Sequence, residues 1–107
     1  MSVADASEKV EISVLVPVMN EAGNIRPLMN EIAAVFAGRS FEILYINDGS
    51  TDNTAKELAE AGAAIPQLRI LNHENRSGQS AALRSGLFAS RGDIIAVLDG
   101  DGQNIPA

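Results

Sequence analysis

Residues 12–18 read Ile12-Ser13-Val14-Leu15-Val16-Pro17-Val18, and this stretch decides the fold. It is an almost continuous run of apolar, mostly β-branched residues, which is typical of a strand buried on both of its faces. Such strands occur in parallel sheets that helices cover on both sides. The stretch therefore predicts the first strand of a parallel α/β sheet, and the polar pair Asn20-Glu21 predicts where that strand has ended.

The rest of the chain alternates between helix and strand patterns. After Asn24, which can cap a helix, apolar residues recur at helical spacing until Gly38 ends the pattern. Further on, the patterns predict a strand over Phe41–Ile46, a helix over Thr51–Ala63, a strand over Leu68–Leu71, a helix after Gly78 and a strand over Ile94–Leu98. The order β-α-β-α-β-α-β predicts a Rossmann-like parallel sheet with right-handed crossovers and helices on both faces.

The composition fits a single acidic globular domain. A chain of 107 residues has room for one core, which we place at residues 10–107, after a polar leader at residues 1–9 that we expect to be disordered. The formal net charge of -6 and the aromatic content of 4% argue against a nucleic-acid partner. The absence of cysteine excludes disulfides and thiolate zinc sites. With no membrane span or signal peptide in the sequence, we expect a cytoplasmic chain.

Polar residues follow three of the predicted strands at the point where each strand ends. These are the pairs Asn20/Glu21, Asn47/Asp48 and Asp99/Asp101. The carboxyl ends of parallel strands lie along one edge of the sheet, and ligands bind beyond that edge where the strand order reverses. The sequence therefore predicts a binding site built from these three strand ends.

Asp99-Gly100-Asp101 places two carboxylates one residue apart on a Gly-rich turn. Carboxylate oxygens are the ligands that Mg²⁺ and Mn²⁺ prefer, but Asp and Gly also favour turns for conformational reasons alone. An EF-hand calcium loop that begins at Asp99 would need Gly at its sixth position, where Asn104 stands, and Glu at its twelfth, which the sequence does not reach. Spacing alone leaves a Mg²⁺ or Mn²⁺ site and a plain turn as the two interpretations.

The polar ends of the first two strands also have two interpretations each. The Asp48 carboxylate can accept a hydrogen bond from the N–H edge of a nucleobase, or it can cap the helix that follows. Asn20 and Glu21 can cap the first helix, while a carboxylate at this edge can equally accept hydrogen bonds from ribose hydroxyls. Both interpretations of each residue stay open at this point.

The loop over residues 75–79 precedes a helix whose free N-terminal amides and dipole are expected to attract an anion. Arg76 in this loop either contacts a diphosphate or is an exposed loop residue. His73 has no second His or Cys partner and is interpreted as a loop residue. The sequence contains neither a Walker motif nor a dinucleotide-binding glycine pattern, so a P-loop and a dinucleotide site are excluded.

Four motifs in fixed order carry a family resemblance, and they lie at residues 16–21, 46–52, 75–86 and 98–104. With them the sequence resembles the family 2 glycosyltransferases of the GT-A fold. It is most similar to the branch that includes dolichol-phosphate mannosyltransferase and the bacterial polyprenyl-phosphate glycosyltransferases. The resemblance runs from about Ile12 to Pro106. Met19, where the family often has Tyr, and Asn47, where it often has a second Asp, depart from the pattern.

The resemblance implies the donor-binding half of an inverting enzyme that moves a sugar from a UDP- or GDP-sugar to a polyprenyl phosphate. Asp48 would contact the base and Glu21 the ribose, and a Mg²⁺ or Mn²⁺ ion, with Asp101 favoured as its direct ligand, would hold the diphosphate. The implied nucleotide-binding residues are Pro17, Val18, Asn20, Glu21, Asp48, Gly49, Arg76, Gly78, Asp99 and Gly100, and the implied metal ligands are Asp99 and Asp101.

No residue here matches the carboxylate that acts as general base in this family. We therefore expect this chain to be inactive alone and to belong to a longer protein at the cytoplasmic face of a membrane. We also expect it to self-associate, because the missing part would leave a sheet edge and apolar helix faces exposed. The alternative function is a non-catalytic nucleotide-binding or assembly module of the same fold. A phosphoacceptor receiver domain ranks last, because its acidic pair would follow the first strand, where Asn20-Glu21 stands.

Overall fold

The fold alternates strands and helices in the order that the sequence predicts. The computed structural model describes residues 9–98, so the predicted leader lies outside it except for Lys9. Within this range no helix is long and apolar enough to cross a membrane. The elements are β1 (Ile12–Val18), α2 (Ile25–Val35), β2 (Phe41–Asp48), α3 (Thr54–Ala64), β3 (Leu68–His73), α4 (Gln79–Ala89) and β4 (Ile94–Val97).

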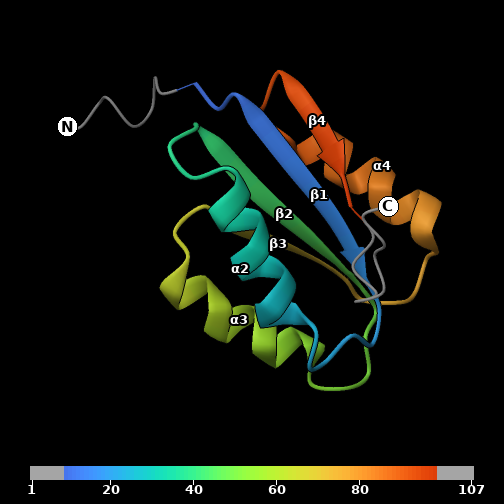
Figure 1. The fold of residues 1–107 in the computed structure, drawn as a ribbon. Helices are drawn as coiled ribbons and strands as arrows, with labels where there is room; N and C mark the ends of the chain where they lie inside the picture. Colours follow the sequence, from blue (N-terminus) through green and yellow to red (C-terminus); the bar gives the residue numbers. More distant parts are fainter. Residues whose placement is uncertain (1–8, 99–107) are drawn as a thin grey trace.

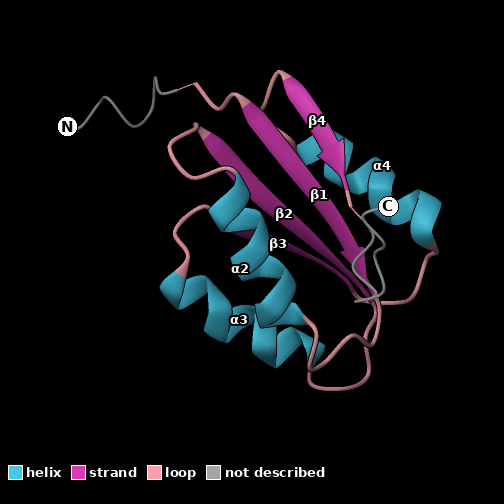
Figure 2. Cartoon of the chain, in the orientation of Figure 1, coloured by secondary structure: helices cyan, strands magenta, loops and turns pink. Residues whose placement is uncertain are grey.

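The four strands form one parallel sheet in the order β3-β2-β1-β4, which confirms the predicted fold class. Helices α2 and α3 cover one face of the sheet and α4 covers the other (Figures 1 and 2). All seven residues of β1 are buried. Val14 and Val16 belong to the core beneath α2 and α3, whereas Leu15 packs with Ala82 of α4 on the opposite face. A strand of β-branched residues is thus buried on both sides, as the sequence predicts.

Two strands extend beyond their predicted ends. β2 continues to Asp48 and β3 to His73, because the ladder between them runs on until these two residues are paired. Conversely, α3 begins at Thr54 rather than at Thr51, because the N–H of Thr51 is bound to the side chain of Asn20 instead of facing a helical turn. The polar pair Asn47/Asp48, which the sequence predicts to follow the second strand, is therefore part of β2.

Apolar side chains remain exposed at the β4 edge of the sheet. Ile94 is 52% exposed and Val97 50% exposed on β4, and Phe88 on the neighbouring α4 is 90% exposed. β1 pairs with β2 on one side and with β4 on the other, so the strand order reverses next to β1. This reversal places the carboxyl end of β1 at the point where parallel α/β sheets bind ligands.

Candidate functional site

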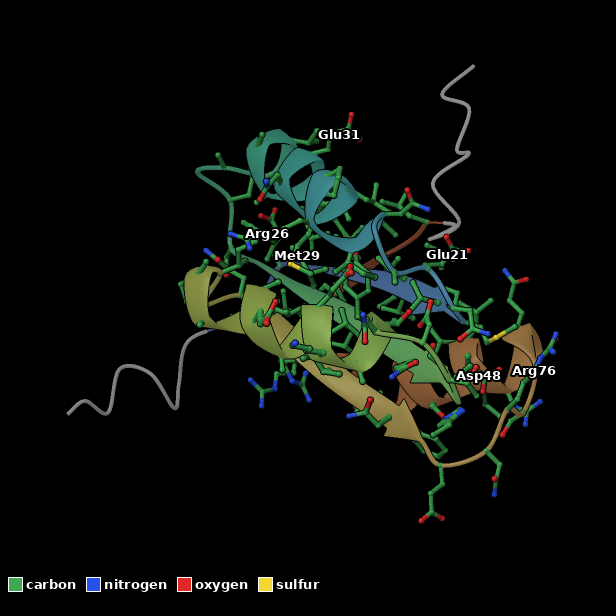
Figure 3. The ribbon with its side chains drawn as sticks, turned by 90° about the horizontal axis from the view of Figure 1, so that it is seen from below. Glu21, Arg26, Met29, Glu31, Asp48 and Arg76 are labelled. Carbon is green, nitrogen blue, oxygen red and sulfur yellow. The ribbon has the colours of Figure 1, made fainter. Side chains whose placement is uncertain are left out.

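A small cavity lies at the carboxyl ends of β1 and β2, beside the connection from β3 to α4. Its volume is about 200 Å³. Figure 3 shows three of its side chains, Glu21, Asp48 and Arg76, at the same end of the molecule. The full lining consists of Pro17, Val18, Met19, Glu21, Asp48, Arg76, Gly78, Gln79 and Ala82.

The structure brings together most of the predicted site residues that it describes. Six of the ten predicted nucleotide-binding residues line the cavity, namely Pro17, Val18, Glu21, Asp48, Arg76 and Gly78. Asn20 and Gly49 do not line it. Asp99 and Gly100, together with the predicted metal ligand Asp101, lie outside the described residues. Gln79 and Ala82 line the cavity without having been predicted to do so.

Asp48 is the buried carboxylate of this cavity, with 4% of the residue exposed. Its Oδ1 accepts hydrogen bonds from the backbone N–H of Ser77 at 2.8 Å and from His73 Nδ1 at 2.9 Å, and its Oδ2 accepts one from the backbone N–H of Gly78 at 2.8 Å. Burial raises the pKa of Asp48, but these hydrogen bonds outweigh it and hold the pKa below the usual 3.8. Asp48 is therefore ionised at neutral pH.

These contacts change the interpretation of the N-terminus of α4. The amides of Ser77 and Gly78, which the sequence predicts to be free for an anionic ligand, bind the Asp48 carboxylate instead. The predicted alternative that Asp48 caps α3 is wrong, because the amides that its carboxylate binds lie directly before α4 and not at the start of α3. The Asp48 carboxylate thus occupies the amides of the two residues that lead into α4.

Gly49 shapes the cavity through close packing of two loops. A Cβ atom at this position would lie 2.4 Å from the backbone N of Arg76, and the φ of Gly49 is +74°. Only glycine combines this backbone conformation with such a close approach. In the described structure, the role of Gly49 is to let the β3–α4 connection pass directly over the end of β2.

Asn20 connects the loops that follow β1 and β2. Its backbone lies in the left-handed region, with φ of +58°. Its Oδ1 accepts hydrogen bonds from the backbone N–H groups of Thr51 at 2.7 Å and Asp52 at 3.2 Å, and its own N–H binds Ser50 Oγ at 2.9 Å. The predicted capping of α2 by this side chain is wrong, since its amide oxygen faces the β2–α3 loop.

Glu21 stands next to Asn20 and lines the cavity. Its backbone N–H binds Thr54 Oγ1 at 2.9 Å, which fixes the loop, and its carboxylate accepts a hydrogen bond from Asn24 Nδ2 at 3.0 Å. Asn24 does occupy the N-cap position of α2, but its side chain makes no capping hydrogen bond. The Glu21 carboxylate is therefore bound to the N-cap residue of α2, while Glu21 also lines the cavity.

His73 is a residue whose importance the sequence prediction missed. It is the last residue of β3 and not a loop residue, and it is paired with Asp48 across the ladder. Its Nδ1 lies 2.9 Å from Asp48 Oδ1 and its Nε2 lies 2.9 Å from Ser85 Oγ. Its place at a strand end was the available signal, because the same rule had selected Asp48 at the end of β2.

Residues 9–98 contain no group of three or more His, Asp or Glu side chains that could hold an ion together. A carboxylate offers about four acceptor positions, and the protein's own donors fill three of those on Asp48. Among residues 9–98, Asp48 and Glu21 are therefore not part of a group of side chains that could hold an ion together.

Comparison with known proteins gives consistent matches. The sequence model of glycosyl transferase family 2 matches residues 13–107. The dodecaprenyl-phosphate galacturonate synthase of Rhizobium johnstonii is 36% identical over 108 residues, which cover 95% of this chain and 31% of that protein. The undecaprenyl-phosphate 4-deoxy-4-formamido-L-arabinose transferase of Pseudomonas aeruginosa is 41% identical over 101 residues, which cover 89% of this chain and 29% of that protein. The chain thus spans less than a third of the length of these relatives.

A solved transferase structure also matches this chain. Glucosyl-3-phosphoglycerate synthase from Mycobacterium tuberculosis, in complex with Mn²⁺, UDP and glucosyl-3-phosphoglycerate, matches with a TM-score of 0.71 and 29% sequence identity. The match covers 91% of this chain and 35% of that enzyme. The arrangement of strands and helices described above is therefore shared with a nucleotide-binding transferase of known structure.

Proposed function

This chain belongs to glycosyl transferase family 2, and from that premise we propose that it binds the nucleoside diphosphate sugar that serves as sugar donor. The observation that carries the proposal is the Asp48 carboxylate, which is buried at the cavity and has three acceptor positions filled. Of the about four positions on a carboxylate, the donors of the described residues 9–98 leave one on Oδ2 open. An N–H group of uracil or guanine matches this open acceptor, because a charged acceptor binds such a donor strongly.

The neighbouring residues fit the rest of a nucleotide. Glu21 offers carboxylate oxygens to the ribose hydroxyls, and Pro17 and Val18 supply an apolar wall beside the base. Arg76 lines the same cavity and offers a guanidinium that can bind phosphate oxygens in a bidentate manner. Gly78 has open space where a Cβ would stand, which leaves room for the ligand. Asn20 and Gly49 act indirectly, by fixing the loops.

We assign the metal role to Asp99 and Asp101, with Asp101 as the direct ligand, and a nucleotide contact to Asp99 and Gly100. The support is chemical, since paired carboxylates suit Mg²⁺ and Mn²⁺, and comparative, since the M. tuberculosis relative was solved with Mn²⁺ and UDP. When bound, the ion would act as a Lewis acid that stabilises the departing nucleoside diphosphate.

For the whole protein we propose transfer of the sugar, with inversion, to a polyprenyl phosphate. The names of two relatives support this acceptor, because one is a dodecaprenyl-phosphate galacturonate synthase and the other an undecaprenyl-phosphate sugar transferase. The chain holds the donor part in this proposal, and the acceptor lipid would bring the protein to the cytoplasmic face of a membrane.

The proposal is tested by thermal unfolding of the 107-residue chain with UDP, GDP or inorganic pyrophosphate, each with and without Mn²⁺. A ligand at 100 times its dissociation constant stabilises the folded state by about 2.7 kcal/mol. For a domain of this size that amounts to a rise in Tm of about 10 °C or more. We expect UDP or GDP to give this rise with Mn²⁺ present, and pyrophosphate to give much less.

Two variants locate the response. Asp48→Asn replaces an acceptor oxygen by an N–H donor and is expected to abolish the nucleotide-induced rise in Tm. Asp93→Asn is expected to retain the rise, because Asp93 directly precedes β4 at the amino ends of the strands, away from the cavity. Each variant is compared with its own ligand-free Tm, so a loss of stability alone does not mimic a loss of binding. If neither nucleotide raises the Tm, or if Asp48→Asn responds as the unchanged chain does, the proposal is wrong.

A further inference from the structure

Three side chains, from α4, β3 and β2, are linked by hydrogen bonds that end at the Asp48 carboxylate. The Oγ of Ser85 lies 2.9 Å from His73 Nε2, and His73 Nδ1 lies 2.9 Å from Asp48 Oδ1. The His73 side chain is 19% exposed and the Asp48 side chain 6% exposed. Ser85 lies inside α4 and is half-buried. The three residues therefore form one largely buried hydrogen-bonded network beside the cavity.

The hydrogen-bond partners of His73 determine that its Nδ1 carries a hydrogen. Ionised Asp48 can only accept, so His73 Nδ1 must carry the hydrogen that it shares with Oδ1. In the neutral imidazole, Nε2 is then an acceptor for the Ser85 hydroxyl, and in the charged form it is a donor to the same oxygen. Because a serine hydroxyl both donates and accepts, the Nδ1–H of His73 points at Asp48 in either state.

This arrangement has the Ser-His-Asp order of nucleophilic hydrolases, but the surroundings of Ser85 do not suit that chemistry. Ser85 is the seventh residue of α4, a helix that runs from Gln79 to Ala89. The backbone N–H groups around it are hydrogen-bonded along the helix, so none is free to stabilise an oxyanion. The network is therefore better explained by what it does to Asp48.

His73 decides which acceptor position of Asp48 is open. The N–H of Ser77 and the Nδ1–H of His73 together occupy Oδ1, while Oδ2 receives, among residues 9–98, only the N–H of Gly78. We propose that His73, held in place by Ser85, is a positioning residue that closes Oδ1 and directs the nucleobase N–H to Oδ2. This inference rests on the proposed function, since it names the residues that set the direction of base recognition at that site.

Matched substitutions separate the two contacts of the imidazole. In His73→Asn the side-chain amide can place an N–H close to the position of Nδ1, which keeps Oδ1 closed but loses Ser85. In His73→Gln the longer amide can reach Ser85 but no longer offers the donor at Nδ1. Ser85→Ala removes only the outer support of the ring, and Glu74→Ala, an exposed neighbour of His73, is the control.

Affinity for UDP and GDP with Mn²⁺ is measured by calorimetry on each folded variant. We expect His73→Gln to weaken binding about tenfold, the equivalent of one lost charge-assisted hydrogen bond. His73→Asn is expected to stay within about threefold of the unchanged chain, and Ser85→Ala to fall between the two. A purely structural role would instead lower the Tm of all three variants and leave the affinity of the folded protein unchanged.

A second measurement does not depend on the ligand. The ¹⁵N shifts of the imidazole report which ring nitrogen carries hydrogen, and we expect neutral His73 to carry it on Nδ1. The opposite tautomer, or equal affinity of His73→Gln and the unchanged chain, overturns the inference and leaves the proposed function standing. Failure of the unchanged chain to bind either nucleotide overturns both.

Discussion

The side-chain oxygen of Asn20 lies 2.7 Å from the backbone N of Thr51, although 31 positions separate the two residues in the sequence. A second bond from the N–H of Asp52 ends on the same oxygen at 3.2 Å. These contacts hold the end of β1 against the loop after β2. They also explain why a residue with φ of +58° is asparagine, which tolerates the left-handed region better than most residues do.

We expect Asn20→Ala to lower the free energy of unfolding by about 2 kcal/mol, because it removes the three hydrogen bonds that the side-chain oxygen accepts and places a residue without local polar partners in the left-handed region. Asn20→Asp keeps an acceptor oxygen and is expected to lose less than half of that. Urea unfolding of both variants measures the difference. Equal losses would mean that backbone strain, and not the contact with Thr51, accounts for the asparagine.

A second prediction concerns Gly49, whose missing Cβ makes room for the backbone of Arg76. Gly49→Ala is expected to lower the free energy of unfolding by about 3 kcal/mol, through overpacking and left-handed strain together. The control is Gly38→Ala, since Gly38 has a similar φ of +88° but nothing within 4 Å of the Cβ position. Strain alone predicts a loss of about 1 kcal/mol for the control. Thermal unfolding measures both variants, and an equal fall in Tm for the two would contradict close packing of Gly49 against the backbone of Arg76.

A third prediction concerns pH. Glu42 is 3% exposed and accepts hydrogen bonds from Ser13 Oγ at 2.6 Å, Arg69 Nη1 at 2.7 Å and the N–H of Arg91 at 2.7 Å. Burial raises the pKa of Glu42, but these bonds and the Arg69 charge outweigh it and hold the pKa below the usual 4.5. A lowered folded-state pKa gives stability that is complete above the unfolded value and is lost as the pH falls through the folded one.

Glu42→Gln is therefore expected to lower the free energy of unfolding by about 2 kcal/mol at pH 7. The difference from the unchanged chain should shrink as the pH falls below 4.5, the usual pKa of this carboxyl. Urea unfolding at pH 7, 5 and 3 measures it, with Glu31→Gln on the exposed side of α2 as the control. A difference that stays constant down to pH 3 would show that the network does not depend on the charge of Glu42.

The fourth prediction concerns the hydroxyl of Tyr45. This residue is fully buried in the core beneath α2 and α3, and within residues 9–98 its Oη has no hydrogen-bond partner. Burial raises the pKa of Tyr45, so the phenol stays neutral. Removing a buried polar group without a partner recovers about 1 kcal/mol, so Tyr45→Phe should raise the Tm in calorimetry. Tyr45→Leu should lower it by leaving a cavity. A lower Tm for Tyr45→Phe would reveal a partner for the hydroxyl.

The fold was predictable because its signals are local. The residues of β1 form one apolar run bounded by polar residues, and the observed strand has the predicted bounds, Ile12–Val18. The ends of β2 and β3 were not predictable in the same way. Asn47 and Asp48 look like loop residues, and only pairing with the neighbouring strand keeps them in the sheet.

The candidate site was predictable as a location but not as a set of contacts. The rule that ligands bind at the carboxyl edge selected Asp48 and Glu21, the loop before a helix N-terminus selected Arg76, and all three line the cavity. That Asn20 joins two loops depends on its left-handed backbone and on partners about thirty positions away, as does the contact of Asp48 with the N-terminus of α4. A single sequence carries no signal for such distant pairs.

The engagement of the α4 N-terminus by Asp48 also has a consequence for the balance of charge at the cavity. The described lining carries two carboxylates, Glu21 and Asp48, against one guanidinium, Arg76. A diphosphate that enters this space is repelled unless it brings its own counter-charge. Without a divalent cation, uridine or guanosine should therefore bind at least as tightly as UDP or GDP, and Mn²⁺ should reverse that order in calorimetric titrations with and without EDTA.

Tighter binding of the diphosphate in EDTA would show that Arg76 alone balances the phosphate charge. In the expected case, cation and diphosphate raise each other's affinity by the same factor, because such coupling is reciprocal. The occupancy of the site then follows the product of two concentrations, free cation and free nucleotide, so a shortage of either one empties it.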